Sequence, residues 1–449
     1  MGKMTIKIGI VSDTHLGAFP LDPELNIDSF EAFDESLKIL VENGADLIIH
    51  SGDFYDRIDP APWIRDKAIS ILRSNITGER PKIKVLEGKV NFEAEDVNIA
   101  VPFFLIHGTH DRPIGRPISA PPFQDLVAAG YANYVDVDPE NEFAMKKVVL
   151  QKGKSKISIS GIGHRPEGYI NESITKCGIQ LTNHAVNVCC THNAIRDIIP
   201  TEGECIDLTA LTGMDYVIAG HAHIPRLSKN NVLDIINHPD LPKTGLLVPG
   251  ATIATGIYPQ EEGKKYAHFL EISDKNKLLD IKSFNLEKAR RIFCETIEVG
   301  GLNALEIRNR IEDYLKNLPL GSLKKKPLVR IDLVGTLRHG ISKRQLKLDE
   351  IKAQFRDKIH NWDDMIIPRE LYSEDELKHL DDLRNAVQTG TTLPAAFSHF
   401  SQKLRDLKYK GKHFTAEELY NTFSDIKTPQ SARKRVEEKL NRVIKNEHD

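Results

Sequence analysis

Five short apolar runs in the first half of the chain each end in a polar signature, and this arrangement constrains the fold more than any other feature. Apolar runs of this length are typical of strands that are buried on both faces. Polar groups that follow the strands of an α/β protein collect at one edge of the sheet, where such proteins bind ligands. The signatures are Asp13-Thr14-His15, Gly52-Asp53, Gly108-Thr109-His110-Asp111, Thr191-His192-Asn193 and Gly220-His221-Ala222-His223.

The spacing of apolar residues predicts helices between the first strands. Phe30, Phe33, Leu37, Leu40 and Val41 recur at helical spacing after the strand TIKIGIVSD, and Gly44 closes that helix. A second helix is predicted from about Trp63 to Leu72, and residues 75–100 are predicted to be an insertion with a hairpin about Gly88. The later strands crowd together. Strands that first alternate with helices and then follow one another closely in the sequence predict a two-sheet α/β sandwich.

Changes of pattern divide the 449 residues into three predicted domains. Residues 1–284 contain the five signatures, and residues 285–365 form a small α+β module. Residues 366–449 are predicted to be helical with polar connections, because Ser373 with Glu376 and Thr415 with Glu418 form capping boxes. Two helical units joined by a polar linker bury little area by themselves. We interpret this region as a docking site for a partner, with a solvated tail as the alternative.

Composition restricts the partners and the compartment. The net charge of −3 means that a nucleic acid would have to be held by a local basic patch, for which Lys324-Lys325-Lys326 and the basic C-terminal face are the candidates. The five cysteines form no CxxC pair, and Cys189-Cys190 is predicted to be core packing. No signal peptide or long apolar segment is evident. We expect a soluble protein of the reducing cytosol, with no membrane partner.

The signatures carry the residue types that bind transition metals. Asp13 and His15 are two residues apart and would share a face of an extended strand, and His221 and His223 repeat this spacing. Asp53 ends another strand and is placed to bridge two ions. Carboxylates combined with imidazoles suit manganese, iron or zinc. Two such ions about 3.5–4 Å apart would activate a hydroxide and clamp both oxygens of an in-line phosphoryl displacement.

The order DxH, GD, GxHD, H and GHxH resembles the calcineurin-like metallophosphoesterases over residues 6 to about 275. The SDTHLG start, the α+β module and the helical C-terminal region are most similar to the nuclease subunit of the SbcC/SbcD-type double-strand-break repair complex, in its archaeal-like form. The resemblance implies a homodimeric 3'-5' exonuclease and endonuclease with two Mn²⁺ ions per subunit or other divalent metals. It also implies double- and single-stranded DNA substrates, a cytoplasmic, nucleoid-associated location, and an SMC-like coiled-coil ATPase bound through residues 366–449.

The resemblance also implies a role for each site residue. One metal is held by Asp13, His15, Asp53 and His223, and the second by Asp53, Thr109, His192 and His221. His110 lies near the scissile phosphate, where it protonates the leaving oxygen or stabilises the developing charge. Asp111 is expected to orient the imidazole of His110.

Two positions depart from the family pattern. The family has GNHD where this chain has Gly108-Thr109-His110-Asp111, and a hydroxyl is shorter than an amide and a poorer metal ligand. We expect Thr109 either to reach the second ion through a water or to leave that site weak. The family often has a histidine where this chain has Asp56, and GDxxDR is similar to protein phosphatases of the superfamily. We interpret Asp56 and Arg57 as a local ion pair on the surface.

Three functions remain open from the sequence. The first is a manganese-dependent DNA nuclease that works with an SMC-like ATPase. The second is a metallophosphatase or nucleotide phosphodiesterase of the same superfamily, for which the C-terminal docking region has no evident use. The third is a DNA-binding scaffold whose second metal site is impaired at Thr109, although the other six ligands are intact. The remaining histidines His50, His107, His164 and His184 are interpreted as structural or without an assigned role, and His164 is the one of them that we expect near the site.

Overall fold

The computed structural model describes most of the first 372 residues. The described ranges are 5–79, 81–90, 97–113, 120–138, 141–166, 168–196, 198, 205–273, 277–372, 377, 408–409 and 412–413. Contacts divide the chain into two compact units: residues 1–295, 319–330 and 354–365 belong to the first, and the rest to the second. This division follows contacts and not chain order, so the three contiguous domains proposed from the sequence stay a prediction.

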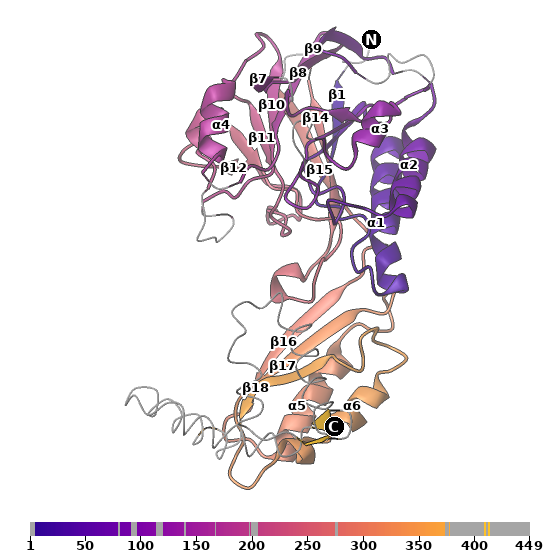
Figure 1. The fold of residues 1–449 in the computed structure, drawn as a ribbon, viewed down its shortest axis with the longest axis vertical. Coiled ribbons are helices and arrows are strands. Elements are labelled where there is room, and N and C mark those ends of the chain that lie inside the picture. The colour runs from indigo at the N-terminus through magenta and orange to yellow at the C-terminus, as the bar shows by residue number, and fades with distance from the viewer. Residues whose placement is uncertain are drawn as a thin grey trace, which may run out of the picture. The chain divides into compact units, whose positions relative to one another are not determined.

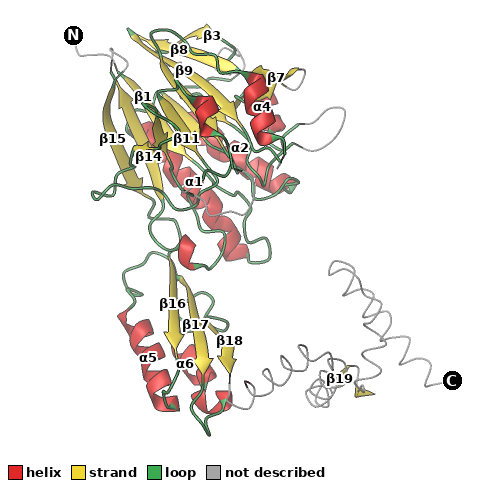
Figure 2. Cartoon of the chain, turned by 90° about the vertical axis from the view of Figure 1, so that its left-hand side faces the viewer, coloured by secondary structure: helices red, strands yellow, loops and turns green. Residues whose placement is uncertain are grey.

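The first unit contains two sheets, labelled in Figures 1 and 2. The six-stranded sheet has the order β15-β14-β1-β2-β4-β5, and β1, β2, β4 and β5 run parallel. The antiparallel strands β14 and β15 form the other edge. The strands are β1 (Ile6–Val11), β2 (Leu47–His50), β4 (Phe103–Leu105), β5 (Asn133–Tyr134), β14 (Tyr266–Ile272) and β15 (Leu278–Asn285).

The seven-stranded sheet has the order β12-β13-β11-β10-β9-β8-β3. Its central strands β13, β11, β10 and β9 are parallel, so their carboxyl ends meet at one edge. Strand β3 pairs antiparallel with β8, and the second arm of the hairpin predicted about Gly88 falls on residues 91–96, outside the described ones. The strands are β3 (Lys84–Glu87), β8 (Lys147–Lys152), β9 (Ser155–Ile162), β10 (Val186–Thr191), β11 (Tyr216–Ala219), β12 (Ile236–Asn237) and β13 (Gly245–Leu247), and β6 (Val137–Asp138) pairs separately with β7 (Asn141–Met145).

The two sheets pack face to face, which confirms the predicted sandwich. One hydrophobic core contains Ile49 of the first sheet together with Val188 and Cys190 of the second. Cys189 points the other way, into a smaller core with Ile174 of α4 (Ile170–Cys177). The prediction that the adjacent cysteines are core packing is thus confirmed. In Figure 1, α4 and the pair α1 (Pro23–Glu42) and α2 (Pro62–Ile76) lie on opposite sides of the sandwich; α3 (Gln124–Ala128) follows β4.

Helix α1 begins and ends where its sequence signals stand. The carboxylate of Asp22 accepts hydrogen bonds from the backbone N–H groups of Glu24 and Leu25, each at 3.0 Å, and Pro23 occupies the first turn. Gly44 adopts a φ of +79° just beyond the last turn, as the predicted helix end requires. The buried face of α1, which includes Phe30, Phe33 and Leu37, is the one that the helical spacing predicts.

The second unit contains a three-stranded sheet of order β16-β17-β18. Strands β16 (Ile292–Glu298) and β17 (Leu328–Thr336) continue into it from the first unit, and α5 (Ala304–Asn317) begins with a capping box of Asn303 and Glu306. The other elements are α6 (Leu348–Gln354), β18 (Ile366–Tyr372) and the short pair β19 (Lys408–Tyr409) and β20 (Lys412–His413). No helix in the part of the chain that the structure describes is long and apolar enough to cross a membrane.

Strand β18 corrects one sequence prediction. Residues 366–372 were assigned to the helical region, but they pair parallel with β17, with Ile366 opposite Ile331 and Tyr372 opposite Thr336. The apolar residues of this segment are too few to show whether their period is two or 3.6. The two capping boxes predicted at Ser373–Glu376 and Thr415–Glu418 lie outside the described residues.

The lysine run is only partly available to a ligand. Lys325 Nζ lies 2.7 Å from Asp28 Oδ1 and 2.6 Å from Glu31 Oε2, so its charge is already paired with α1. Lys324 is largely exposed, and its Nζ lies 3.9 Å from Glu287. The hypothesis that all three lysines bind phosphate therefore needs correction, because Lys325 serves to attach its own segment to α1.

Candidate metal centre

Four candidate ligands have left-handed backbone conformations. The φ angles are +49° at Asp13, +43° at His15, +52° at Asp53 and +75° at His221. Such conformations are costly for residues other than glycine and are found where the surrounding structure imposes them, often at functional sites. The prediction that Asp13 and His15 share one face of an extended strand is wrong in its geometry. Strand β1 ends at Val11, and a turn in the loop beyond it directs both side chains to the site.

Two glycines of the signatures are required by close approach. A Cβ atom at Gly108 would lie 2.2 Å from Oδ1 of Asp53, and one at Gly52 would lie 2.2 Å from Nδ1 of His192. Gly52 also has a φ of +103°. Any side chain at either position would displace a candidate ligand. The glycines therefore permit the loops to converge.

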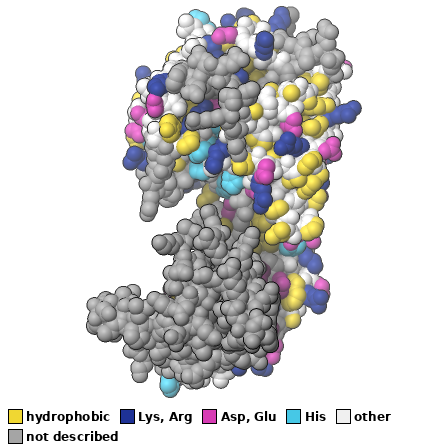
Figure 3. All heavy atoms as spheres, viewed as in Figure 1, with side chains coloured by type: hydrophobic (Ala, Val, Ile, Leu, Met, Phe, Trp, Pro, Cys, Tyr) yellow, Lys and Arg dark blue, Asp and Glu magenta, His cyan; other side chains and the backbone are white. Residues whose placement is uncertain are grey.

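Three overlapping groups of possible ligands lie at this edge of the two sheets. In each group the ligand atoms lie within 4.8 Å of one another. Asp53 and His15 each belong to two of the groups, which places Asp53 between two sets of imidazoles. The groups are Asp13 with His15 and His223; His15 with Asp53 and His110; and Asp53 with His192 and His221. Figure 3 shows histidine side chains gathered at the surface of this face.

Individual distances suit ions held between the side chains. Nε2 of His15 lies 3.2 Å from Nε2 of His223 and 3.7 Å from Oδ2 of Asp53. Nε2 of His192 lies 3.0 Å from Oδ2 of Asp53 and 3.8 Å from Oδ1 of Asp13. These separations resemble those between atoms that share a metal, because bonds of about 2.0–2.2 Å place adjacent ligand atoms roughly 3 Å apart.

The residues fit a divalent cation by their chemistry as well. Nε2 of His192 is buried and, among the described residues, has no hydrogen-bond partner, although it faces two buried carboxylates. Burial lowers the pKa of His192, but Asp53 and Asp13 outweigh burial and raise that pKa to about 10. Burial likewise raises the pKa of Asp53, but His192 brings it well below its usual value. The buried carboxylates thus stabilise a positive charge, which an ion would supply.

The second nitrogen of three of the candidate imidazoles, those of His192, His15 and His223, faces a partner. Nδ1 of His192 donates to the backbone carbonyl of Ser51 at 2.7 Å, and Nδ1 of His15 lies 3.2 Å from Oδ1 of Asp56. Nδ1 of His223 lies 2.6 Å from Oε1 of Glu261. Such partners leave Nε2 free for a metal and orient the ring. The interpretation of Asp56 as one half of a surface ion pair is wrong, because its carboxylate faces His15.

Glu261 is a site residue that the sequence analysis missed. It lies in η3 (Pro259–Glu261), is 6% exposed, and its Oε2 also accepts a hydrogen bond from Lys265 at 2.8 Å. Burial would raise the pKa of Glu261, but the bond with His223 and the charge of Lys265 lower it to about 2. No motif identifies this residue, since it follows His223 by 38 positions and becomes its neighbour only on folding.

His110 and Asp111 lie at the site but do not contact each other as predicted. Nδ1 of His110 donates to the backbone carbonyl of Asp56 at 2.9 Å, and the ring is exposed. The carboxylate of Asp111 is fully buried and accepts backbone N–H groups of Gly108 at 2.6 Å and Phe54 at 2.7 Å. Burial, followed by the charge of Asp53, raises its pKa to about 6. Asp111 therefore joins the Asp53 loop to its own loop, and does not orient His110.

Thr109, which the resemblance makes a ligand of the second ion, has one described side-chain contact, with His164. Its side chain is half-buried, and Oγ1 lies 3.5 Å from Nδ1 of His164, at the long limit of a hydrogen bond. Burial and the neighbouring His192 lower the pKa of His164 to about 4. The prediction that His164 is close to the site is confirmed. Two further buried histidines support the loops: His50 lies 3.0 Å from the hydroxyl of Thr14, and His107 lies 3.0 Å from Asp136.

Comparisons with known proteins agree with this geometry. Residues 6–225 match the family described as calcineurin-like phosphoesterase. The double-strand break repair protein MRE11 of Encephalitozoon cuniculi is 26% identical over 346 residues, which cover 73% of this chain and 56% of that protein. The MRE11 proteins of Homo sapiens and Mus musculus are each 27% identical; the matches cover 73% and 65% of this chain, and 50% and 43% of theirs. The chain thus spans about half the length of these relatives.

Proposed function

Given that the chain carries a calcineurin-like metallophosphoesterase domain, we propose that it is a metal-dependent DNA nuclease, with 3'-5' exonuclease and endonuclease activity in one site. The observation that carries the proposal is the position of Asp53 in two of the three ligand groups. A shared carboxylate between two sets of imidazoles is the arrangement that two-metal phosphodiester hydrolysis needs.

Two Mn²⁺ ions are the proposed cofactors. Asp13, His15, Asp53 and His223 would hold the first, and Asp53, Thr109, His192 and His221 the second. When bound, such ions supply a hydroxide at neutral pH and stabilise charge on the attacking and leaving oxygens. Oxygen and imidazole ligands together favour manganese, iron or zinc over calcium and magnesium.

His110 is the proposed catalytic residue, and it is not one of the proposed metal ligands. Because Nδ1 donates to the carbonyl of Asp56, Nε2 is the nitrogen that faces a substrate, and it can carry the proton needed by a leaving oxygen. The exposure of the ring allows DNA to reach it. Asp56 therefore positions two imidazoles, His110 through its carbonyl and His15 through its carboxylate.

The substrate class rests on the relatives. The MRE11 proteins to which the chain is similar are named as double-strand break repair proteins, and this favours DNA ends over small phosphate esters. A metallophosphatase would use the same metal centre, so the centre alone does not choose between them. A scaffold without activity is disfavoured by the buried, converging ligands, which would be costly to keep without an ion.

The test compares substrates and variants with manganese present. Wild type, Thr109→Asn and His110→Ser are assayed on single-stranded DNA, double-stranded DNA and p-nitrophenyl phosphate. We expect the wild type to cleave DNA and His110→Ser to lose most of that cleavage. Cleavage that depends on Thr109→Asn would support the scaffold, whereas hydrolysis of p-nitrophenyl phosphate without cleavage of DNA in any variant would support the phosphatase.

Further partners belong to the same proposal. An SMC-like coiled-coil ATPase would bind through residues 366–449, and a second copy of the chain would bind through the phosphoesterase domain. Both follow from the resemblance to the repair nuclease subunit. The proposed location is the cytoplasm, at the nucleoid.

A further inference from the structure

Three neighbouring parallel strands of the seven-stranded sheet each end in a histidine. Strands β9, β10 and β11 are adjacent, and Ile162, Thr191 and Ala219 are aligned across them. His192 follows β10 directly, and His221 follows β11 by two residues. His164 stands in the same position relative to β9 as His221 does relative to β11. The register therefore brings a third imidazole to the edge that carries two candidate ligands.

Hydrogen bonds hold the β9 end against the β10 end. The backbone N–H of His192 donates to the carbonyl of Ile162 at 3.3 Å. The amide of Asn193 donates to the carbonyl of Gly163 at 3.2 Å and accepts from the backbone N–H of Arg165 at 3.0 Å. His164 lies between these two anchored residues, so its position beside His192 is set by the backbone.

The side chain of His164 contacts Thr109, the weakest of the proposed ligands of the second ion. Its Nδ1 lies 3.5 Å from the hydroxyl of Thr109, while Asp53, His192 and His221 form a compact group of three strong donors. A neutral hydroxyl is a poor ligand for a transition metal, and an imidazole is a good one. His164 belongs to none of the three groups of closely spaced ligand atoms, so its ring would have to turn toward His192 to bind the ion.

We propose that His164, in place of Thr109, is the fourth protein ligand of the ion held by Asp53, His192 and His221, and that Thr109 is hydrogen-bonded to His164. This rests on the proposed metal centre and assigns to it a residue that follows a further strand, β9. The second site is then a full site of three imidazoles and a shared carboxylate, and the threonine does not weaken it.

Removal of the His164 side chain should leave the local fold intact, because backbone hydrogen bonds hold this segment. The contacts of His164 with its surroundings are made mostly by its backbone: its N–H donates to the carbonyl of His107 at 3.2 Å, and its carbonyl accepts from Nε2 of His107 at 3.0 Å and from Arg165 at 3.1 Å. His164→Ala keeps all three bonds. His184→Ala, which removes an exposed histidine ahead of β10, is the matched control.

The experiment titrates the metal-free full chain with manganous chloride, following heat of binding and the electron paramagnetic resonance of the bound ions. We expect two ions in wild type and His184→Ala, with the spectrum of a coupled pair. His164→Ala should keep one ion at unchanged affinity, lose at least ten-fold in affinity for the other, and show an isolated ion. Thr109→Asn in the His164→Ala background should restore the second ion, because an amide then replaces the lost imidazole.

The outcomes separate this inference from the proposed function. Two ions bound equally well by wild type and His164→Ala would overturn the role of His164 and leave the nuclease proposal standing. A loss in His164→Ala that Thr109→Asn does not restore would also overturn it, since the ring would then act only through packing. Failure of the wild type to bind a pair of ions would overturn both.

Discussion

At the scale of single residues, the tautomer of His110 is set by the backbone. Its Nδ1 donates to the carbonyl of Asp56, so Nε2 faces the substrate side whether the neighbouring carboxylates are protonated or ionised. A backbone carbonyl cannot be protonated near neutral pH, and the orientation of the ring is therefore independent of pH in this range. Asp111, which the sequence analysis paired with His110, is occupied by backbone N–H groups instead.

The contrast between His110 and Asp111 gives the first prediction. His110→Asn should lower the rate of DNA cleavage by about 10²–10⁴-fold, the usual range for loss of an acid–base group, and should leave binding of two Mn²⁺ ions nearly unchanged. Asp111→Asn should instead weaken metal binding and lower stability, because it disturbs the hydrogen bonds that join the Gly108 and Phe54 backbones. Cleavage rates and calorimetric titration distinguish the two. Loss of metal in His110→Asn would contradict the assignment.

Glu261 gives the second prediction. Glu261→Gln removes the charge that faces Nδ1 of His223 at 2.6 Å, and should weaken binding of the ion held by Asp13, His15 and His223 by about 10–100-fold, as is usual for a residue behind a ligating histidine. Calorimetric titration with Mn²⁺ measures this change. Glu172→Gln, at an exposed pair on α4, is the control and should bind metal as the wild type does. Equal affinity in the two variants would refute the role of Glu261.

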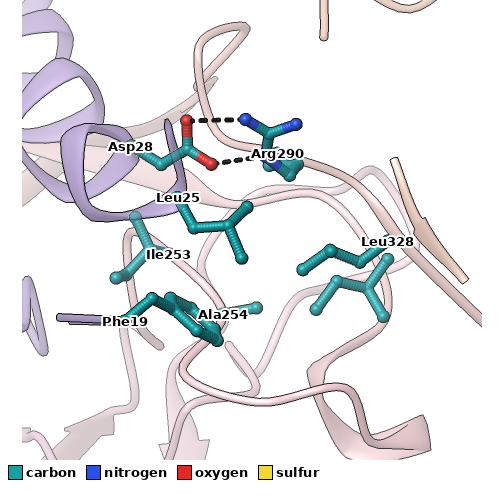
Figure 4. A pocket seen from close by; sticks show the side chains of 8 residues that line it. Phe19, Leu25, Asp28, Ile253, Ala254, Arg290 and Leu328 are labelled. Atoms are coloured by element: carbon teal, nitrogen blue, oxygen red, sulfur yellow. Dashed lines mark hydrogen bonds and ion pairs between the residues drawn. The ribbon is translucent and has the colours of Figure 1, made fainter. Parts of the chain in front are cut away.

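At the scale of elements, a buried arginine is one of the groups that link helix α1 to the segment after β15. Arg290 is 6% exposed and forms ion pairs with Asp28 and, at 3.0 Å, with Glu24; it also donates to the carbonyl of Lys326 at 2.6 Å. Figure 4 shows Arg290 and Asp28 at the wall of a small apolar cavity formed with Leu25 and Leu328. At about 10 Å³ the cavity is too small for more than one water, so it is a packing defect and no ligand site.

The third prediction concerns this arginine. Arg290→Ala should lower the free energy of unfolding of the first unit by about 3 kcal/mol, because it leaves Asp28 with a buried charge that Lys325 only partly compensates. Urea unfolding measures the change. Lys288→Ala removes a neighbouring cation whose pair with Asp34 is exposed, and should cost less than about 1 kcal/mol. Similar losses in the two variants would show that the burial of Arg290 has no energetic effect.

Strand β14 contains a buried histidine that is satisfied only when neutral. Nε2 of His268 donates to the carbonyl of Pro249 at 2.9 Å, and Nδ1 accepts from the hydroxyl of Ser283 at 2.7 Å. That hydroxyl oxygen already accepts from the backbone N–H of Leu233 at 2.8 Å. Burial lowers the pKa of His268 to about 4. An imidazolium here would direct an N–H at a hydroxyl that is itself a donor.

The fourth prediction follows from the sign of this shift. Between pH 6.5 and about 4 the unfolded chain binds a proton at His268 and the folded chain does not, so stability is complete above pH 6.5 and falls as pH falls toward 4. Urea unfolding with a chelator present should show a flatter dependence on pH in His268→Gln than in wild type over this range. His339→Gln, in the second unit, should keep the wild-type slope. Identical slopes in all three proteins would contradict the prediction.

At the scale of the whole molecule, the position of strand β18 determines which truncation removes the proposed docking region without removing a strand of the second unit. It pairs with β17 from Ile366 to Tyr372, so a truncation at residue 366 removes an edge of the sheet together with the proposed docking region. A truncation after Tyr372 removes the docking region alone. The two truncations therefore separate partner binding from folding of the second unit.

The fifth prediction uses these two truncations. A chain ending at Tyr372 should lose co-purification with the proposed SMC-like ATPase partner, and should keep wild-type affinity for Mn²⁺, because all candidate ligands belong to the first unit. A chain ending at Met365 should in addition lose protection of β17 in hydrogen exchange. Retention of the ATPase by the chain ending at Tyr372 would refute a docking role for the region beyond that residue.

Much of the fold and the site could be predicted from local sequence. The apolar run before Asp13 and the helical spacing of Phe30, Phe33 and Leu37 have periods that local geometry imposes, and the structure confirms both elements. The pairing of β3 with β8 could not be predicted, because partners such as Glu87 and Val149 lie far apart in the chain and no turn chemistry links them.

The sequence by itself determined the types of ligand and their place at the ends of buried strands. Both can be read from a short stretch of residues, because an apolar run indicates a buried strand and the residue type fixes the ligand chemistry. Only the tertiary structure decided which groups meet. It placed Asp56 against His15, Glu261 against His223 and His164 against Thr109, and it separated Asp111 from the ring of His110. These contacts join residues far apart in the chain, or depend on left-handed turns at Asp13, His15 and Asp53, and the packing of the two sheets imposes those turns against the intrinsic preference of each residue.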